Sequence, residues 1–184
     1  HQITEIFTKP WKERIRFLKL ANVKYIISQD RLDREPDLKG KVAKVNGLVY
    51  RIRDFLPRAW IVGKIKKIKQ GTVNELIDGS FNPAKSALGK RNFELQYDTP
   101  FSGNIDQIDY QKNSEIHIEV QTEKPRVLIV SEASYPGWKV YVDGEEKKCL
   151  RLDILFQGVA IGPGRHDIVF KFRPKHFSLF LFIS

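Results

Sequence analysis

The chain has 184 residues, of which 41% are hydrophobic and 29% are charged, and it carries a formal net charge of +10. This composition excludes wholesale disorder, and the length allows one large domain or two small ones, either with a substantial core. The charge leaves three explanations open: binding to nucleic acid, contact with an anionic membrane surface, and solubility alone.

The first half of the chain predicts a small α+β unit. Amphipathic and capping patterns predict two helices, and alternating apolar residues predict three strands. The helices are expected over 10–20 and 72–78, and the strands over 23–28, 47–54 and 58–65. The polar stretch 29–41, which contains Pro36 and Gly40, is expected to be an exposed loop.

The second half predicts an antiparallel β-sandwich of the immunoglobulin-like or jelly-roll-like kind. Residues 79–104 are richer in Gly, Pro, Ser and Asn, so the boundary between the two halves is placed there. Strands are then expected over 104–110, 115–120, 126–130, 138–142, 146–151, 154–161 and 166–172. Short strands with turn signals roughly every 8–12 residues are typical of a sandwich.

The residues around Trp138 hold the strongest local signals. Trp138, Val140 and Val142 alternate along one face of a strand, so Trp138 is expected in the core. Asp143-Gly144 is a strong signal for a type I′ turn, because both central positions of that turn need a positive φ. His166, which follows a glycine-rich turn, is expected to hydrogen-bond locally.

The single cysteine, Cys149, limits the chemistry that the chain can support. One cysteine cannot form an internal disulfide, and it cannot build a zinc site from several thiolates. Cys149 follows the predicted hairpin and is expected to be an ordinary strand residue. We expect no metal site and no other cofactor.

The last eight residues, 177–184, carry no charge. A spanning helix needs about 20 apolar residues, so this piece alone cannot cross a bilayer. It follows several basic residues and is interpreted as the start of a membrane span. The predicted fold class is therefore α+β, with a small α+β domain over 1–90, a β-sandwich over 91–175 and the start of a transmembrane helix over 176–184.

Six segments, taken together and in this order along the chain, resemble one protein family. They are 20–27, 57–63, 135–144, 155–159, 162–168 and 172–174. The most specific combination is Pro136-Gly137-Trp138 with Asp143-Gly144 and a downstream Gly-x-Gly-x-His that ends at His166. The group resembles the C-terminal soluble region of the large polytopic bacterial and archaeal membrane proteins of the YfhO type.

The resemblance implies a piece of a glycosyltransferase-like membrane protein that uses lipid-linked sugar donors. In such enzymes the acidic catalytic residues lie in extracytoplasmic loops near the N-terminal spans, and no segment of this sequence matches those loops. The resemblance therefore assigns no catalytic residue here. It implies a non-catalytic domain on the extracytoplasmic side of the cell membrane, which positions a glycan acceptor, a lipid-linked sugar donor or a protein partner.

Two sets of residues are candidates for binding within that hypothesis. Trp60, Tyr135 and Tyr141 are candidates for stacking on sugar rings, which rests mainly on the resemblance. The basic cluster consists of Lys64, Lys66, Lys67 and Lys69. In a membrane-proximal domain these lysines suggest contact with anionic lipid headgroups or with a phosphorylated lipid carrier. A solvated strand edge is the plainer interpretation, because lysines there discourage edge pairing.

Two other functions remain open. A basic nucleic-acid-binding domain would combine the lysines with stacking aromatic residues and a recognition motif, which the sequence lacks, so nucleic acid is not the expected partner. A self-contained glycoside hydrolase would need two carboxylates, and Glu115 and Glu119 share one strand face, with Asp106 expected nearby. Alternating charges are more typical of a solvated strand face, and His117, on that same face, is expected to be exposed.

Overall fold

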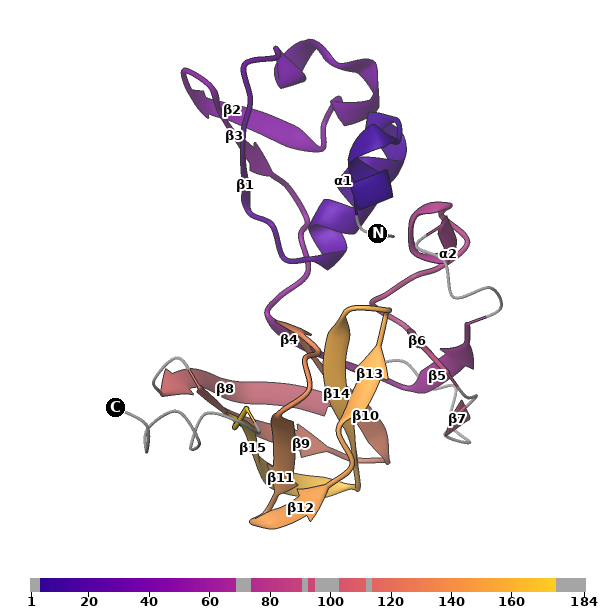
Figure 1. The fold of residues 1–184 in the computed structure, drawn as a ribbon, viewed down its shortest axis with the longest axis vertical. Coiled ribbons are helices and arrows are strands. Elements are labelled where there is room, and N and C mark those ends of the chain that lie inside the picture. Colours follow the sequence, from indigo (N-terminus) through magenta and orange to yellow (C-terminus); the bar gives the residue numbers. More distant parts are fainter. Residues whose placement is uncertain (1–3, 69–73, 91–92, 95–102, 112–113, 175–184) are drawn as a thin grey trace, which may run out of the picture. The chain divides into compact units, whose positions relative to one another are not determined.

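The computed structural model describes residues 4–68, 74–90, 93–94, 103–111 and 114–174, and the chain divides into two compact units (Figure 1). The first unit comprises residues 1–58 and 68–84, and the second comprises 59–67 and 85–184. The chain therefore enters the second unit at residue 59, returns to the first at 68 and leaves it again at 85. A single boundary within 79–104, as expected from composition, does not describe this path.

Within the described residues, the first unit combines short helices with an antiparallel three-stranded sheet. The helices are η1 (Thr4–Thr8), α1 (Trp11–Leu20), η2 (Leu32–Arg34), η3 (Pro36–Leu38) and α2 (Asn74–Ile77), and the strands are β1 (Tyr25–Ile27), β2 (Val42–Asn46) and β3 (Val49–Ile52). The strand order is β1-β3-β2. Strand β2 was not predicted, because its apolar residues do not alternate and only Val42 is buried.

The core of the first unit is built from α1, η2, η3 and the sheet. Ile15 of α1 and Tyr50 and Ile52 of β3 are at most 1% exposed. Leu32 in η2 and Leu38 in η3 are each 1% exposed and belong to the same cluster. The prediction of an exposed loop over 29–41 is therefore wrong at these two leucines, because their apolar side chains complete the core.

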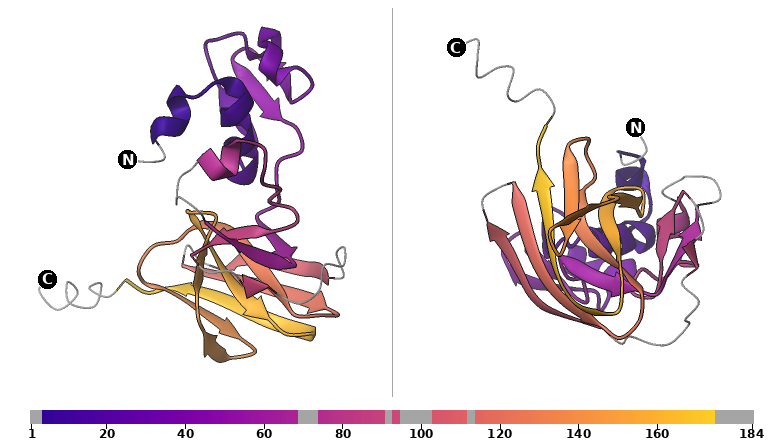
Figure 2. Two further views of the ribbon diagram at one scale, coloured as in Figure 1. Left: turned by 90° about the vertical axis from the view of Figure 1, so that its right-hand side faces the viewer. Right: turned by 90° about the horizontal axis from the view of Figure 1, so that it is seen from below.

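The second unit is a sandwich of two sheets (Figures 1 and 2). The seven-stranded sheet contains β4 (Ala59–Val62), β5 (Lys64–Lys67), β6 (Ala87–Gly89), β7 (Phe93–Glu94), β10 (Arg126–Ala133), β13 (Leu150–Leu152) and β14 (Phe156–Ile161), in the order β4-β10-β14-β13-β6-β5-β7. The five-stranded sheet contains β8 (Gly103–Gln111), β9 (Glu115–Thr122), β11 (Trp138–Val142), β12 (Glu145–Lys147) and β15 (Gly164–Phe172), in the order β12-β11-β15-β9-β8. Among the described residues of this unit, every strand pairing is antiparallel except that of β5 with β6.

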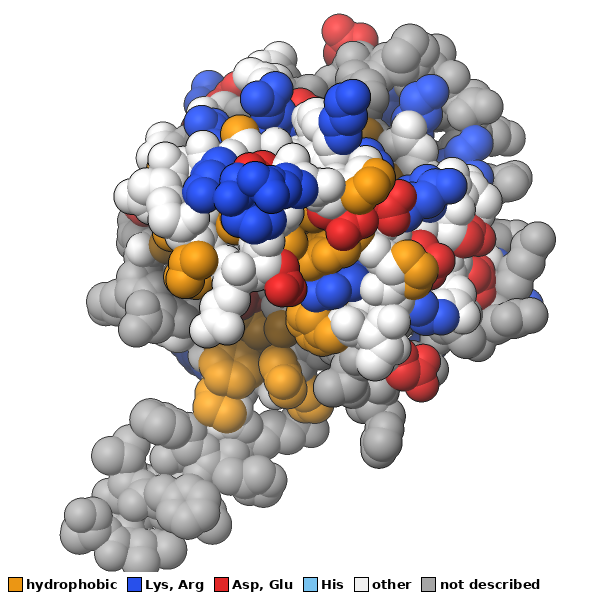
Figure 3. All heavy atoms as spheres, turned by 90° about the horizontal axis from the view of Figure 1, so that it is seen from above, with side chains coloured by type: hydrophobic (Ala, Val, Ile, Leu, Met, Phe, Trp, Pro, Cys, Tyr) orange, Lys and Arg blue, Asp and Glu red, His pale blue; other side chains and the backbone are white. Residues whose placement is uncertain are grey.

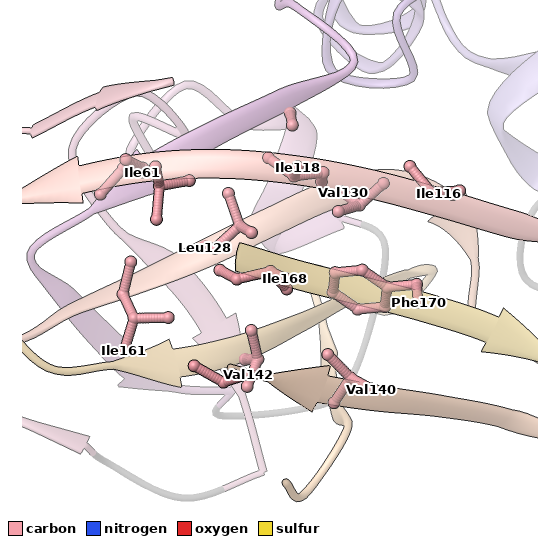
Figure 4. Packing of buried hydrophobic residues seen from close by; sticks show 13 residues of the cluster. Ile61, Ile116, Ile118, Leu128, Val130, Val140, Val142, Ile161, Ile168 and Phe170 are labelled. Carbon is pink, nitrogen blue, oxygen red and sulfur yellow. The ribbon is translucent and has the colours of Figure 1, made fainter. Parts of the chain in front are cut away.

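Period-2 alternation in both sheets creates the core of the sandwich (Figure 4). The five-stranded sheet contributes Ile116, Ile118, Val120, Val140, Val142, Ile168 and Phe170, and the seven-stranded sheet contributes Ala59, Ile61, Leu128, Val130, Val159 and Ile161. Full burial of such an aliphatic or aromatic side chain stabilises a fold by roughly 1.5–3 kcal/mol. The predicted α+β class with an antiparallel sandwich is confirmed.

The turn between β11 and β12 has the geometry that its sequence predicts. The predicted strand 146–151 instead divides into β12 and β13, which belong to different sheets. Trp138 packs against the core, and its ring centroid lies 5.2 Å from that of Phe172 on β15. Asp143 and Gly144 in the turn have φ values of 52° and 83°. Both values are positive, as the turn signal requires.

Asp143 ties this turn to β15. Its Oδ1 accepts a hydrogen bond of 2.9 Å from the backbone N–H of Asp167, and its Oδ2 lies 2.7 Å from Nδ1 of His166. The other ring nitrogen of His166 lies 3.2 Å from the carbonyl oxygen of Gly162, so the expected local hydrogen bonding is confirmed. The hydrogen bond with His166 and, to a smaller extent, the bond from the backbone N–H of Asp167 hold the pKa of Asp143 below its ordinary value.

Replacing Asp143 with alanine is expected to lower the free energy of unfolding by about 1–2 kcal/mol at pH 7, because it removes two hydrogen bonds and places a Cβ without a polar group at positive φ. Asp143→Asn keeps an acceptor and tolerates positive φ, so it should lose less than half as much. The pKa of Asp143 in the folded protein lies below its ordinary value of 3.8. The ionised carboxylate therefore contributes fully to the free energy of unfolding above pH 3.8, and this contribution is lost as the pH falls through the folded-state pKa. Urea denaturation of both variants at several pH values checks this, and equal losses in Asp143→Ala and Asp143→Asn would contradict it.

No helix in the part of the chain that the structure describes is long and apolar enough to span a membrane. The predicted start of a span, residues 176–184, lies outside the described residues. The predicted capping residue Thr72 lies outside them as well.

Candidate functional site

The outer face of the five-stranded sheet carries polar side chains at the positions that alternate with the core. This polar face consists of Glu115, His117 and Glu119 on β9, Arg165, Asp167, Val169 and Lys171 on β15, Lys139 and Tyr141 on β11, Glu146 on β12 and Asp109 on β8. The register places Tyr141, Val169, His117 and Asp109 in one row across four strands. Residues far apart in the sequence therefore meet on one surface.

Ion pairs between strands organise the charges of the polar face. Lys139 Nζ donates to Glu146 Oε2 at 2.8 Å, and Arg165 Nη2 donates to Glu119 Oε2 at 2.6 Å. Each pair is largely exposed, so it contributes at most about 1 kcal/mol to stability. These contacts hold the side chains in place more than they stabilise the fold.

Glu115 has two partners on the polar face. Its carboxylate lies 3.4 Å from Nε2 of His117 and 3.6 Å from Nζ of Lys171. The hydrogen bond with His117, and then the charge of Lys171, keep the pKa of Glu115 below its ordinary value despite partial desolvation. Glu115 is therefore ionised at neutral pH and can accept hydrogen bonds from hydroxyl groups.

Tyr141 is the aromatic member of the polar face. It is half-buried, and it pairs with Val169 on one side and with Glu146 on the other. Lys139 lies on the same face of β11, two residues before Tyr141. A phenol ring beside a carboxylate and an ammonium group can stack on the apolar side of a sugar ring while its neighbours hydrogen-bond the hydroxyls. Tyr141 is a candidate for sugar contact by family resemblance, and the structure places Glu146 directly opposite it.

The other two aromatic candidates lie elsewhere in the second unit. Tyr135, in the loop between β10 and β11, is 67% exposed and stays a candidate for sugar contact. Trp60 is only 6% exposed, and its ring packs edge-on against Phe156 at a centroid distance of 5.9 Å. Trp60 therefore offers no free ring face, because β4 is buried along its whole length.

The basic cluster lies on β5, in the other sheet. Lys64 and Lys66 project from one side of the strand, and Lys67 projects from the side of buried Ile65. Lys66 and Lys67 are exposed, Lys64 is half-buried, and Lys69 lies outside the described residues. The cluster and Tyr141 thus belong to different sheets, and the structure does not combine them into one site.

The two glutamates of the hydrolase hypothesis are not arranged as a catalytic pair. Glu115 and Glu119 lie four residues apart on one strand, which separates them by roughly 13 Å along β9. Glycosidases hold their carboxylates roughly 5–10 Å apart, and the general acid needs a raised pKa. The pKa of Glu115 is lowered instead, and Glu119 is paired with Arg165.

Cys149 is not set up as a nucleophile. It lies between β12 and β13 rather than in a strand, so the expectation of a strand residue is wrong. The thiol is partly buried against the sandwich core and lies 3.6 Å from Oε1 of Gln157. Burial raises its pKa, so the reactive thiolate is disfavoured.

Sequence reasoning missed the basic and acidic partners on the neighbouring strands. Lys139, Glu146, Arg165 and Lys171 entered no hypothesis, although each contacts another member of the polar face. The available signal was the alternation within each strand, since it predicts which residues face outward. The order and register of the strands were needed to show that these residues are neighbours.

The second half of the chain matches a known protein family. Residues 94–184 match the family described as bacterial membrane protein YfhO. This match confirms the family resemblance for the segments 135–144, 155–159, 162–168 and 172–174, and it covers the five-stranded sheet with the polar face. The segments 20–27 and 57–63 lie outside the matched residues. No curated protein sequence matches the chain.

Proposed function

We propose, from the match of residues 94–184 to the YfhO family of bacterial membrane proteins, that the chain is a non-catalytic, extracytoplasmic domain of a polytopic glycosyltransferase-like protein. In this proposal it positions a glycan acceptor, a lipid-linked sugar donor or a partner for a reaction carried out elsewhere in the protein. Its sugar-binding surface is the polar face around Tyr141.

The row of Tyr141, Val169, His117 and Asp109 is the observation that supports this proposal most strongly. It combines an aromatic ring with acceptors and donors over four strands, as the recognition of a flat, hydroxylated ligand requires. The glutamates of the polar face already pair with cations, Glu115 with Lys171 and Glu119 with Arg165. This arrangement supports binding of a neutral sugar better than general acid–base chemistry.

Tyr141→Ala is expected to weaken sugar binding about tenfold, because an aromatic contact of about 1.4 kcal/mol corresponds to that factor. The measurement is NMR titration of the chain with gluco-, galacto- and N-acetylglucosamine oligosaccharides. Tyr110→Ala is the matched control. Tyr110 on β8 is 42% exposed and pairs with buried Ile116, so it lies outside the polar face. Equal losses in both variants, or no saturable shift with any sugar, would overturn the proposal.

The lysines of β5 add a second element to the proposal. Lys64, Lys66 and Lys67, together with Lys69, would contact the phosphate of a lipid carrier or anionic headgroups. The exposure of Lys66 and Lys67 supports this role. Such contacts are screened by salt, whereas stacking on Tyr141 is not, so titration at two ionic strengths separates the two contributions.

A further inference from the structure

An unusual group of exposed apolar side chains lies on the small sheet of the first unit. Among the described residues, seven large hydrophobic side chains are exposed, and four of them lie in β1, β2 and the turn after β2. These are Tyr25 (48%), Ile27 (79%), Val45 (55%) and Leu48 (48%). Single exposed apolar residues are ordinary, but a group of them on one small element points to a binding surface.

Strand register shows that part of this group shares one side of the sheet. Ile27 pairs with Val49, and Tyr25 pairs with Arg51, so these four residues project from the same side. The opposite side carries Ile26, Tyr50 and Ile52, which contact the core of the first unit. Leu48 occupies the turn between β2 and β3, and Val45 lies at an irregularity in their pairing, next to that turn. We call Tyr25, Ile27, Val45, Leu48 and Val49 the apolar tip.

The strands that carry the apolar tip are basic. Residues 23–28 and 42–53 contain four cations, Lys24, Lys44, Arg51 and Arg53, and no aspartate or glutamate. Lys24 Nζ lies 5.6 Å from the centroid of the Tyr25 ring, and exposed Arg51 pairs with Tyr25. Figure 3 shows lysine and arginine side chains next to hydrophobic ones on one face of the molecule.

We propose that the apolar tip inserts into the interfacial region of an anionic lipid bilayer, while Lys24, Arg51 and Arg53 bind its headgroups. Aliphatic side chains gain by leaving water for the acyl boundary, and tyrosine favours the membrane–water interface. Each lysine or arginine near an anionic surface adds to the attraction. Nucleic acid would satisfy the cations, but it would leave Ile27 and Leu48 in water. The inference concerns the first unit and does not depend on sugar binding by the second.

The test is binding of the chain to vesicles of phosphatidylcholine with and without phosphatidylglycerol. Wild type should bind the anionic vesicles, and the double variant Ile27→Glu, Leu48→Glu should bind them at least about tenfold more weakly, because it replaces inserted aliphatic groups with charges. Phe7→Gln is the matched control. Phe7 lies on η1, is 56% exposed and is not part of the apolar tip, so this variant should bind like wild type.

A second measurement separates insertion from surface attraction. In a Cys149→Ser background, an environment-sensitive fluorophore attached through Leu48→Cys should shift to the blue on anionic vesicles, and one attached through Phe7→Cys should not. The proposal would be overturned if the double variant bound anionic vesicles as tightly as wild type. It would also be overturned if the fluorophores at positions 48 and 7 responded identically. Light scattering that shows a wild-type dimer and a monomeric double variant would overturn it as well, because the apolar tip would then join two copies of the chain.

Discussion

Gly158→Ala is expected to lower the free energy of unfolding by about 3 kcal/mol or more, at the upper end of overpacking effects. Gly158 lies in β14, between β10 and β13 in the seven-stranded sheet. A Cβ at this position would overlap the backbone carbonyl oxygen of Leu128 and would lie 2.7 Å from Cδ1 of Leu152. The leucine side chain can move, but the carbonyl oxygen belongs to a neighbouring strand, so the sheet itself must shift.

Gly162→Ala is the matched control for this prediction. Gly162 belongs to the same unit and precedes Pro163, and the atom nearest to a Cβ at this position would be Nε2 of His166, at 3.9 Å. Its substitution should change the free energy of unfolding by less than about 0.5 kcal/mol. Urea denaturation followed by tryptophan fluorescence measures both variants. A Gly158→Ala protein as stable as Gly162→Ala would show that the three central strands are not packed as described.

Asp153→Asn is expected to remove a large pH dependence from the stability of the second unit. Asp153 is fully buried, and its Oδ1 accepts a 2.7 Å hydrogen bond from the backbone N–H of Leu88. Its Oδ2 has no hydrogen-bond partner among the described residues. Burial raises the pKa of Asp153 to about 7, although the bond from Leu88 acts in the opposite direction.

The direction of the pH effect follows from proton binding. Above the ordinary value of 3.8 the unfolded chain has released this proton, whereas the folded chain keeps it up to about 7. Stability therefore falls as the pH rises through this window. Between pH 5 and pH 8 this one group should lower the free energy of unfolding by about 2–3 kcal/mol. Asparagine carries no such proton, and it tolerates the positive φ of 46° at this position.

The measurement is the free energy of unfolding of wild type and Asp153→Asn at pH 5 and pH 8. Comparing the two proteins at each pH cancels the other titrating groups. Glu145→Gln is the control, because Lys147 lowers the pKa of Glu145 and keeps this residue ionised over the whole range. Parallel pH profiles for wild type and Asp153→Asn would contradict the buried, neutral carboxyl group.

Much of the sandwich follows from local sequence patterns. The alternation in 115–120 correctly predicts which side of β9 is buried, because the side-chain period of a strand is two. The Asp143-Gly144 pair correctly predicts the hairpin turn, because few residues accept positive φ twice in succession. Both signals are confined to a few neighbouring residues.

Long-range pairing could not be predicted in the same way. Strand β4 looks like a continuation of the first unit, but it pairs with β10, more than 60 residues later in the chain. Strand β5 pairs in parallel with β6, and the segment between them includes α2 of the first unit. Composition does not encode these partners, so a boundary drawn from Gly, Pro, Ser and Asn content misplaces Ala59–Lys67.

In the candidate site, too, the sequence predicts features within one strand but not the neighbours on other strands. Alternation predicts that Glu115, His117 and Glu119 face outward together, and the structure agrees. It does not predict that Tyr141 lies in the same row as His117, because this depends on the order β11-β15-β9. Trp60 was named as an exposed aromatic, but its strand is buried on both sides, which a single strand pattern cannot show.

The most direct test of the proposed function is a glycan-array and lipid-overlay screen of the purified chain at low and physiological salt, with nucleic acid as a control. Sugar recognition by the polar face predicts saturable glycan binding that persists at physiological salt and is weakened by Tyr141→Ala. Binding only to anionic lipid or nucleic acid, fading as salt is added, would contradict it.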